Sequence, residues 1–388
     1  MRFHTSTLVY LGMVFCLLVV PRALQRFRLP SALTCFALGI LGTIFYKPLA
    51  GDRVMNVVAT LGIASLFLFA GLEADLVEIR RQVPRISSHL GLRVLFVALF
   101  AWLAIRLLHL GWQPAALLAL GLLTPSTGFI LDTLPDSGLP VKEQNEVEID
   151  AVVGEMTALL LLFVVSQAGS IQTLAICSVG LFLLVALTPF LFLALGRYVV
   201  PYAPGSEFSL LIMVGVICAV ITNSLGIHFL IGAFTAGLVA GQLKERMVTL
   251  VSYENLQAVR LFASFFIPFY FFHEGLNVPG GALVLKSVLY GVGLLAVVLP
   301  VRIGKIWAQS CWFSKRDVRG GFRVAVALTP TLIFTLVIAG ILHETFHVDD
   351  ALYGGLLIYA VGTTLLPSFV LPGLTQNTLN ALAREAEA

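Results

Sequence analysis

Two short stretches of similar sequence decide the fold, LLTPSTGF at residues 122–129 and ALTPTLIF at residues 327–334. Each stretch places a Thr-Pro pair in the middle of an apolar run, at Pro125 and at Pro330. A proline inside a helix removes one backbone hydrogen bond and clashes with the preceding turn. One such proline would mean a simple kink, but two at matching places predict a pair of broken helices that cross within a membrane.

Hydroxyl side chains flank both prolines, and we expect them to bond to the backbone groups that the two breaks leave unpaired. In lipid a hydroxyl can satisfy a carbonyl that a proline has freed. Together with the helix ends it can also face an ion. We therefore expect these hydroxyls to line an ion site at the crossing. They belong to Thr124, Ser126, Thr127, Thr329 and Thr331.

The Thr-Pro stretches are one of three matches between the two halves of the chain. LPSALTCFALGILG (29–42) resembles GIHFLIGAFTAGLVAG (226–241), and FLFAGLEADL (67–76) resembles YFFHEGLNV (270–278). Each pair is seven expected helices apart, and an odd offset means that the second copy enters the membrane from the opposite face. The matches therefore predict inverted repeats, which are typical of transporters whose site lies at the bilayer midplane.

These matches define the expected organisation of a single membrane domain over residues 1–374. The first six-helix repeat covers about 1–169, a linking helix about 171–197, and the second repeat about 207–374. The remaining residues, 375–388, are expected to form a short cytoplasmic tail.

The composition places the chain in lipid, because 59% of its 388 residues are hydrophobic and only 12% are charged. Soluble domains are about 45–50% apolar and about 25% charged. Spanning helices need about 20 mostly apolar residues, and about thirteen such stretches occur, which predicts an all-α polytopic membrane protein. The expected spans are 6–24, 30–48, 54–74, 87–109, 114–134, 145–168, 171–197, 207–223, 226–242, 258–277, 281–311, 318–342 and 348–372.

The basic residues predict the orientation, because cytoplasmic loops carry the excess of lysine and arginine. The loops on the two sides of the membrane form two sets, one poor and one rich in lysine and arginine. The poor set carries little beyond Arg2, Lys47 and Arg53. The N-terminus is therefore expected outside and the C-terminus in the cytoplasm. The rich set carries Arg22, Arg26, Arg28, Arg80, Arg81, Arg85, Lys142, Arg197, Lys244, Arg246, Arg260, Lys315, Arg316, Arg319 and Arg323.

Glu155 lies near the middle of the expected span 145–168 and is the acid that the sequence buries most deeply. A charge at that depth costs at least about 2.5–3.5 kcal/mol, so we expect Glu155 to bind a proton and a cation in turn. A structural ion pair is the alternative. Asp150 lies five residues nearer the cytoplasm, where it forms either a solvated helix end or, with Glu146 and Glu148, an acidic funnel for cations.

Two other charged pairs stand in apolar surroundings. Arg302 and Lys305 lie three residues apart and so share one helix face. We expect one of them to pair with Glu155 or with carbonyls of the broken helices. His273 and Glu274 end a span at the expected outer surface, where they form either an interfacial hydrogen-bonded pair or an outer gate with a proton relay.

At these residues the chain resembles the bacterial sodium(potassium)/proton antiporters of the second monovalent cation:proton antiporter family, which includes Kef-type transporters and Nap-type exchangers. The likeness covers nearly the whole chain and corresponds to the membrane domain only. Its more specific pieces, in order, are LFLFAGLEADL (66–76), TPSTGFILDTL (124–134), IGAFTAGLVAG (231–241) and the FF-x-x-GL ending at 271–276.

The resemblance implies a thirteen-helix inverted-repeat fold, usually in a homodimer, with an acid on the sixth helix that binds cation or proton in turn. The family's acidic pair falls on Gly154 and Glu155, and its basic residue falls on Lys305 or, less closely, on Arg302. Because Gly154 has no side chain, one carboxylate remains. That implies electroneutral exchange of one cation for one proton, unless Asp150 supplies the missing acid.

We therefore predict a secondary antiporter that exchanges Na⁺ or K⁺ for H⁺ by alternating access in the inner membrane and serves pH homeostasis. Glu155 would be the shared carrier, and Lys305 would pair with it when the site is empty. Two alternatives stay open: a sodium-coupled symporter of an organic anion on a similar fold, and an uncoupled channel-like or sensory membrane protein.

The expected partners are the transported cation and proton, the lipid bilayer and a second copy of the chain. No nucleophile, phosphate-binding or metalloprotease motif occurs, so we expect no enzyme, no cofactor and no metal beyond the transported cation. The small net charge of +3 gives no indication of nucleic-acid binding.

Overall fold

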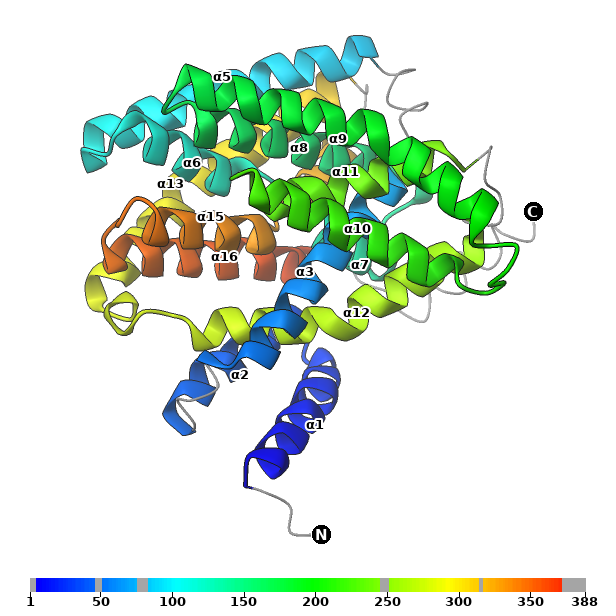
Figure 1. The fold of residues 1–388 in the computed structure, drawn as a ribbon. Coiled ribbons are helices and arrows are strands. Elements are labelled where there is room, and N and C mark those ends of the chain that lie inside the picture. The colour runs from blue at the N-terminus through cyan, green and yellow to red at the C-terminus, as the bar shows by residue number, and fades with distance from the viewer. Residues whose placement is uncertain (1–4, 46–50, 75–82, 245–250, 314–316, 372–388) are drawn as a thin grey trace. The chain divides into compact units, whose positions relative to one another are not determined.

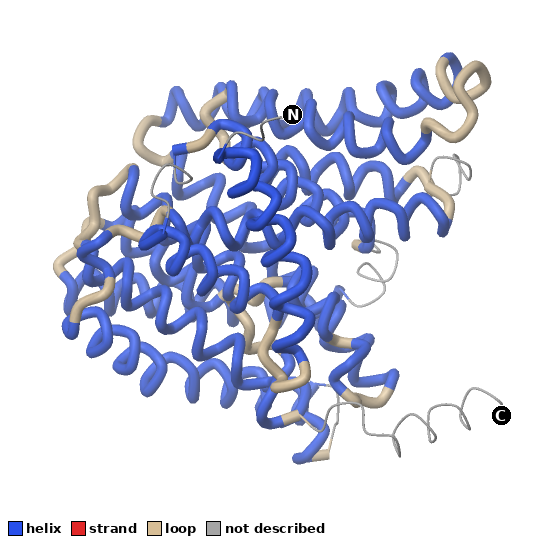
Figure 2. The backbone as a smooth tube through the Cα atoms, turned by 90° about the horizontal axis from the view of Figure 1, so that it is seen from below, coloured by secondary structure: helices blue, strands red, loops and turns tan. Residues whose placement is uncertain are grey.

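The computed structural model describes residues 5–45, 51–74, 83–244, 251–313 and 317–371, which form helices joined by loops (Figure 1). No strand occurs among these residues (Figure 2). The predicted all-α class is confirmed. The helices fall into two compact units, and each unit takes segments from both halves of the chain.

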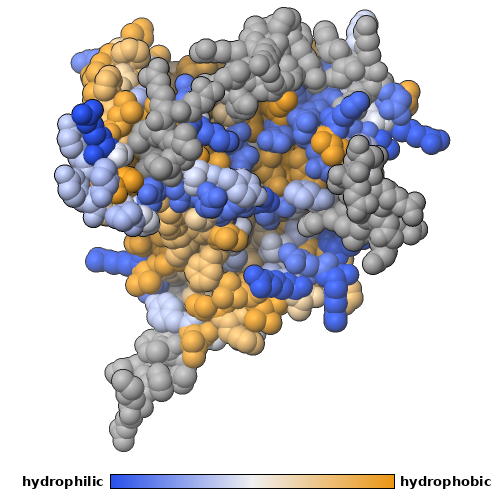
Figure 3. Space-filling model, turned by 90° about the vertical axis from the view of Figure 1, so that its right-hand side faces the viewer, coloured by the Kyte–Doolittle hydropathy of each residue, from blue (hydrophilic) through white to orange (hydrophobic). Residues whose placement is uncertain are grey.

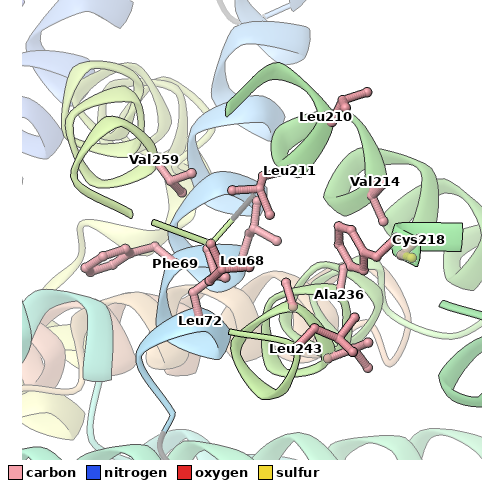
Figure 4. Close-up of a cluster of buried hydrophobic side chains, with 14 of the residues drawn as sticks. Leu68, Phe69, Leu72, Leu210, Leu211, Val214, Cys218, Ala236, Leu243 and Val259 are labelled. Atoms are coloured by element: carbon pink, nitrogen blue, oxygen red, sulfur yellow. The ribbon is translucent and has the colours of Figure 1, made fainter. Parts of the chain in front are cut away.

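Unit 1 comprises Met1–Leu76 and Ser166–Val278. Its core joins α3, α10, α11 and α12, whose side chains meet around Leu68, Leu211 and Ala236 (Figure 4). The described helices of unit 1 are α1 (Thr5–Gln25), α2 (Ser31–Phe45), α3 (Arg53–Glu73), α9 (Ile171–Tyr198), α10 (Glu207–Ser224), α11 (Phe229–Gln242) and α12 (Tyr253–Leu276).

The helices α3 and α11 approach closely because each presents a glycine to the backbone of the other. A Cβ atom added to Gly71 would lie 2.8 Å from the backbone nitrogen of Leu238. One added to Gly237 would lie 2.9 Å from the backbone nitrogen of Leu72. Membrane helices gain their packing energy from such small residues, since lipid removes the hydrophobic drive between helices.

The packing in unit 1 agrees with an inverted repeat. α3 packs against both α11 and α12, and α2 packs against α12. The sequence matches pair α2 with α11 and α3 with α12. Exchanging each helix for its counterpart turns the contact of α2 with α12 into the contact of α11 with α3, so the two contacts are equivalent. The repeat boundaries stay a prediction, and the expected tail 375–388 lies outside the described residues.

Unit 2 comprises Val77–Val165 and Pro279–Ala388 and holds both Thr-Pro stretches. The last two residues of its helix α8 are assigned to unit 1. The described elements of unit 2 are α5 (Val83–Leu108), α6 (Trp112–Leu123), α7 (Thr127–Thr133), η2 (Pro135–Ser137), α8 (Val141–Gln167), η3 (Gly280–Ala282), α13 (Leu285–Phe313), α14 (Val318–Ala327), α15 (Leu332–Glu344) and α16 (Asp350–Val370).

The helices are those of a multi-span membrane protein. Within the described part of the chain, nine segments are long and apolar enough to cross a membrane, and α14 with α15, bent by 44° at their break, would make ten. Three shorter apolar segments of 10–17 residues lie in α1, α2 and α11. All thirteen expected stretches coincide with apolar helices or helix pairs, but helix length alone does not confirm thirteen crossings.

Large apolar side chains are exposed on these helices, as on a surface that faces lipid. Phe182 and Phe190 on α9 are examples. A space-filling view shows patches of apolar side chains between polar ones on the face that it presents (Figure 3). A water-soluble protein rarely exposes so much apolar surface.

The glycine contact between α3 and α11 predicts that Gly237→Ala lowers stability, although alanine is the better helix former. Alanine in a helix interior normally gains about 1 kcal/mol over glycine, whereas overpacking a tight contact costs about 1–3 kcal/mol. We expect a lower thermal unfolding midpoint for the purified protein in detergent. The matched control is Gly293→Ala on α13, where an added Cβ meets nothing within 4 Å. Equal midpoints for the two variants would contradict the packing argument.

Candidate functional site

Two broken helices meet in unit 2 where the sequence predicted them. Residues 124–126 separate α6 from α7, and residues 328–331 separate α14 from α15. The two breaks bond directly to each other, because the backbone N–H of Ser126 donates to the carbonyl of Pro330 at 2.9 Å. The predicted pair of crossed broken helices is confirmed.

The Ser126 side chain caps the other broken helix. Its hydroxyl oxygen accepts from the backbone N–H groups of Ile333 at 3.0 Å and Phe334 at 3.3 Å. These are the second and third residues of α15, whose own preceding residue, Thr331, makes no side-chain cap. A hydroxyl oxygen has two acceptor lone pairs, and both are used here. The geometry gives Ser126 a structural role at the crossing.

The hydroxyls of the second break bond within unit 2 to α16. Thr329 Oγ1 donates to the carbonyls of Val326 at 2.7 Å and Thr363 at 3.1 Å. Thr331 Oγ1 and Thr363 Oγ1 lie 3.0 Å apart and share a hydrogen bond. Freed backbone groups at membrane depth are therefore satisfied by neighbouring side chains, as the expectation for a proline break requires.

Glu155 and Thr127 form a different kind of contact. Glu155 on α8 is only 2% exposed, and Thr127, the first residue of α7, faces its carboxylate with its hydroxyl and its backbone N–H. Glu155 Oε2 and Thr127 Oγ1 are nevertheless both buried without a hydrogen-bond partner. Thr124, the remaining predicted hydroxyl, is buried at the start of the same break. The hydroxyls of Ser126, Thr329 and Thr331 thus form hydrogen bonds at the crossing, whereas Thr127 faces the acid.

Arg302 binds the carbonyl end of α14. Its Nη2 donates to the carbonyl of Leu328 at 3.2 Å, and its Nη1 donates to the carbonyl of Thr329 and to the Tyr359 hydroxyl, both at 3.1 Å. Tyr359 in turn donates to the carbonyl of Leu122 at 2.8 Å. Of the two pairings that the sequence left open for this arginine, the structure shows the one with carbonyls. No sequence signal singled out Tyr359, a tyrosine within an apolar run.

A cavity of about 30 Å³ lies beside this arginine, and we call it the basic cavity. That volume is enough for about one water molecule or a desolvated ion of similar size. Both breaks contribute to its wall through Pro125 and Leu328. Its polar and charged lining comes from Arg93, Asp150, Arg302, Lys305 and Gln309.

Lys305 lies in the basic cavity with Asp150. Its Nζ is 5.1 Å from the centroid of the Phe96 ring, and the charge of Asp150 acts on it. Glu155 is not among the residues that line this cavity. Asp150 is half-buried and lines the cavity, and both alternatives that the sequence left open for it stay predictions. The predicted pairing of Lys305 with Glu155 stays a prediction.

An ion pair that the sequence analysis did not single out ties α8 to α14. Arg323 Nε donates to Glu143 Oε2 at 2.9 Å, and Arg323 Nη2 donates to the second carboxylate oxygen. Bidentate pairs of this kind fix geometry as well as charge. The pair holds one half of the second broken helix against the helix that carries Glu155. The two residues are 180 positions apart, and one sequence gives no signal that pairs them.

His273 and Glu274 are the predicted site residues that belong to unit 1. They lie in the last turn of α12, with His273 Nδ1 4.0 Å from Glu274 Oε1. The Asn277 side chain donates to the His273 carbonyl at 2.9 Å. All the other predicted site residues belong to unit 2.

Comparison with known proteins agrees with this geometry. The family model for transmembrane sodium/hydrogen exchangers matches residues 12–376. A Na⁺/H⁺ antiporter of Enterococcus hirae is 22% identical over an alignment of 383 positions, which covers 94% of this chain and 97% of that protein. The high-affinity Na⁺/H⁺ antiporter NhaS3 of Synechocystis sp. is 22% identical, over 82% of this chain and 70% of that protein.

A solved structure has the same fold. The sodium proton antiporter MjNhaP1 of Methanocaldococcus jannaschii superposes with a TM-score of 0.67 at 12% sequence identity. The superposition covers 94% of this chain and 95% of that one. At this identity the likeness concerns the fold.

The cap across the crossing predicts that Ser126→Ala destabilises the protein. Two buried N–H groups of α15 would lose their acceptor, and each such loss costs about 1–3 kcal/mol. Thermal unfolding in detergent measures the effect. The control is Ser224→Ala on α10, an exposed serine whose hydroxyl donates to the Val220 carbonyl, where we expect a change within about 0.5 kcal/mol. A Ser126→Ala protein as stable as this control would refute the capping role.

The ion pair of Glu143 with Arg323 predicts coupled effects of two substitutions. Removing one partner of a fully buried pair costs about 3–5 kcal/mol. Because the Arg323 side chain is 37% exposed, we expect about 1–3 kcal/mol for Glu143→Gln or Arg323→Gln alone. The double variant should lose clearly less stability than the sum of the single losses. Strict additivity in the unfolding measurements would show that the two residues do not interact.

Proposed function

This chain belongs to the sodium/hydrogen exchanger family, and on that premise we propose that it exchanges a monovalent cation for protons across a membrane by alternating access. Sodium is the first candidate, because the relatives from Enterococcus hirae and Synechocystis sp. and the protein of the solved structure are named as sodium/proton antiporters. Potassium is the second candidate. The family is one of transporters, and the proposal is accordingly transport and not enzymatic catalysis.

The observation that carries the proposal is the contact of Glu155 with Thr127. A carboxylate buried without full compensation is costly, and binding either a proton or a cation removes the cost. Alkali cations are hard ions that prefer oxygen ligands, as other hard cations do. The Glu155 carboxylate and the Thr127 hydroxyl supply such ligands. Proton and cation therefore compete for one carboxylate, and that competition is the basis of exchange.

The broken-helix ends support this assignment electrostatically. The carbonyl end of a helix carries partial negative charge and its N–H end partial positive charge. Arg302 binds carbonyls at the end of α14, so that end is compensated by a permanent cation. The backbone N–H of Thr127 at the start of α7 faces the carboxylate of Glu155. The carbonyl end of α14 thus meets a positive charge, and the N–H end of α7 meets the negative charge of Glu155. Of these two charges, that of Glu155 is the one that a bound proton or cation can neutralise.

With one exchanging carboxylate, the proposal is one cation for one proton and hence electroneutral exchange. The sequence asymmetry in basic residues supports an inner-membrane location with the N-terminus outside and the C-terminus in the cytoplasm. A homodimer and a role in pH homeostasis complete the proposal. His273 and Glu274 stay candidates for an outer gate.

The central prediction is that Glu155→Gln abolishes cation-dependent proton movement. Glutamine keeps the shape of the side chain but cannot release a proton or balance a cation. Purified protein in liposomes with a trapped pH-sensitive dye receives a proton gradient, followed by sodium, potassium or lithium. Wild-type protein should dissipate the gradient, and Glu155→Gln should slow this at least about a hundredfold. The control Glu207→Gln, at the start of α10 in unit 1, should behave as the wild type.

Three outcomes would contradict the proposal in different ways. Full exchange by a folded Glu155→Gln protein would show that another group is the carrier. Sodium uptake driven by an organic anion without proton counterflow would identify a symporter. Cation conductance without proton exchange would identify an uncoupled channel-like protein.

A further inference from the structure

The basic cavity has more basic than acidic side chains in its wall. Arg93, Arg302 and Lys305 line it on the basic side, and Asp150 is the acid among its lining residues. All four belong to unit 2, with Arg93 on α5, Asp150 on α8 and the other two on α13. A charge taken out of water is costly unless an opposite charge compensates it. The wall of this cavity therefore suits an anion better than a cation.

Two buried donors in the same wall have no hydrogen-bond partner within the described part of the chain. They are Nη1 of Arg93 and Nε2 of Gln309, and Gln309 as a whole is only 7% exposed. Guanidinium and amide N–H groups can only donate. Because a buried donor without an acceptor is costly, both groups require an acceptor, and both residues line the cavity.

Gly154 determines where the Arg93 guanidinium lies. A Cβ atom added to Gly154 would lie 2.8 Å from Nη2 and 2.9 Å from Cζ of Arg93, closer than real Cβ atoms come to other atoms. The guanidinium is therefore packed against the backbone of α8. A side chain at position 154 would displace it, so the glycine is part of how the cavity wall is built.

The α13 residues of the wall share one helix face. Arg302, Lys305 and Gln309 are spaced by three and four positions, which places their side chains on the same side of the helix. Arg302 already donates to carbonyls of the second break and to Tyr359, so it contributes mainly charge. Lys305 contributes a charge and an ammonium group with three N–H donors. The cavity thus joins donors of α13 to a donor of α5.

We propose that the basic cavity binds one chloride ion, which accepts hydrogen bonds from Arg93, Lys305 and Gln309. The volume of about 30 Å³ holds one particle about as large as a water molecule, and this admits a monatomic anion and excludes larger anions such as sulfate or gluconate. Rings of arginine and lysine select anions in the same way in channels. A water molecule could accept from the donors, but it carries no charge and would leave the excess of positive charge in place.

This site is separate from the proposed exchange. Glu155 and Thr127 are not among the residues that line the basic cavity. The inference therefore goes beyond the proposed antiport and does not depend on it, and chloride binding can be measured on protein that is not transporting.

The test uses the purified protein in detergent and sodium gluconate. Gluconate is replaced stepwise by chloride at constant sodium concentration and ionic strength. A ligand that binds only the folded state raises the thermal unfolding midpoint as its concentration rises, so the midpoint should rise with chloride and give its affinity. Equilibrium dialysis with radioactive chloride should find one anion per chain. Bromide should displace this chloride, whereas an equal concentration of sulfate should not.

Two variants and a control locate the site. Gln309→Leu removes one donor and no charge, and it should weaken chloride binding about tenfold or more. The matched control is Gln113→Leu on α6, whose amide already donates to the Val165 carbonyl at 3.1 Å and which should keep the wild-type affinity. If Gln309→Leu does not fold, Lys305→Met removes a charge from the wall and should also weaken chloride binding by at least about tenfold.

The two ways in which the inference can fail are distinct. A wild-type protein that binds no chloride in dialysis and unfolds at the same temperature in chloride and in gluconate would show that the donors are satisfied by water, and the inference would be overturned. Chloride binding that the folded variants at Gln309 or Lys305 retain unchanged would belong to another part of the protein, and this would overturn the assignment to the basic cavity.

Discussion

Unit 2 depends on how two broken helices satisfy their backbone groups within the membrane. Each proline interrupts a helix at membrane depth, and an unpaired N–H or carbonyl there costs several kcal/mol. The breaks solve this jointly, because the Ser126 N–H donates to the Pro330 carbonyl and the Ser126 hydroxyl caps α15. Neither broken helix would be satisfied alone, so the two Thr-Pro stretches are structurally one feature, and both must be present for either to be stable.

The crossing is asymmetric although the repeats that build it are alike. The start of α15 is capped by Ser126, whereas the start of α7 faces Glu155 through Thr127. Thr331, the counterpart of a capping residue, bonds to Thr363 instead. The N–H groups at the start of α15 are therefore capped by a neutral hydroxyl, whereas the start of α7 faces an acid. In the proposed exchange, only the acid can be neutralised by a proton or a cation, so the proposal assigns exchange to the side of the crossing that carries Glu155.

Much of the fold could be predicted from the sequence, and the reasons are local. Apolar runs of spanning length gave the helices, and Pro125 and Pro330 gave the breaks, since proline acts on its own turn. Glu155 could be singled out because a mid-span acid is costly wherever it lies. The partners could not be read in the same way. Ser126 as a cap for α15, and Glu143 as the partner of Arg323, depend on contacts between distant segments, and no local pattern in a single sequence marks such contacts.

The contact of Arg93 with Gly154 shows how a contact between distant segments changes the interpretation of a residue. Gly154 taken alone is a missing side chain that leaves one carboxylate of the acidic pair. With the guanidinium of Arg93 packed on it, the same glycine makes room for a fixed cation beside Asp150. Asp150 therefore shares the basic cavity with three cationic side chains, whereas Glu155 faces the start of α7 through Thr127. The surroundings of Asp150 and Glu155 thus differ within one helix, because their neighbours come from different distant segments of the chain.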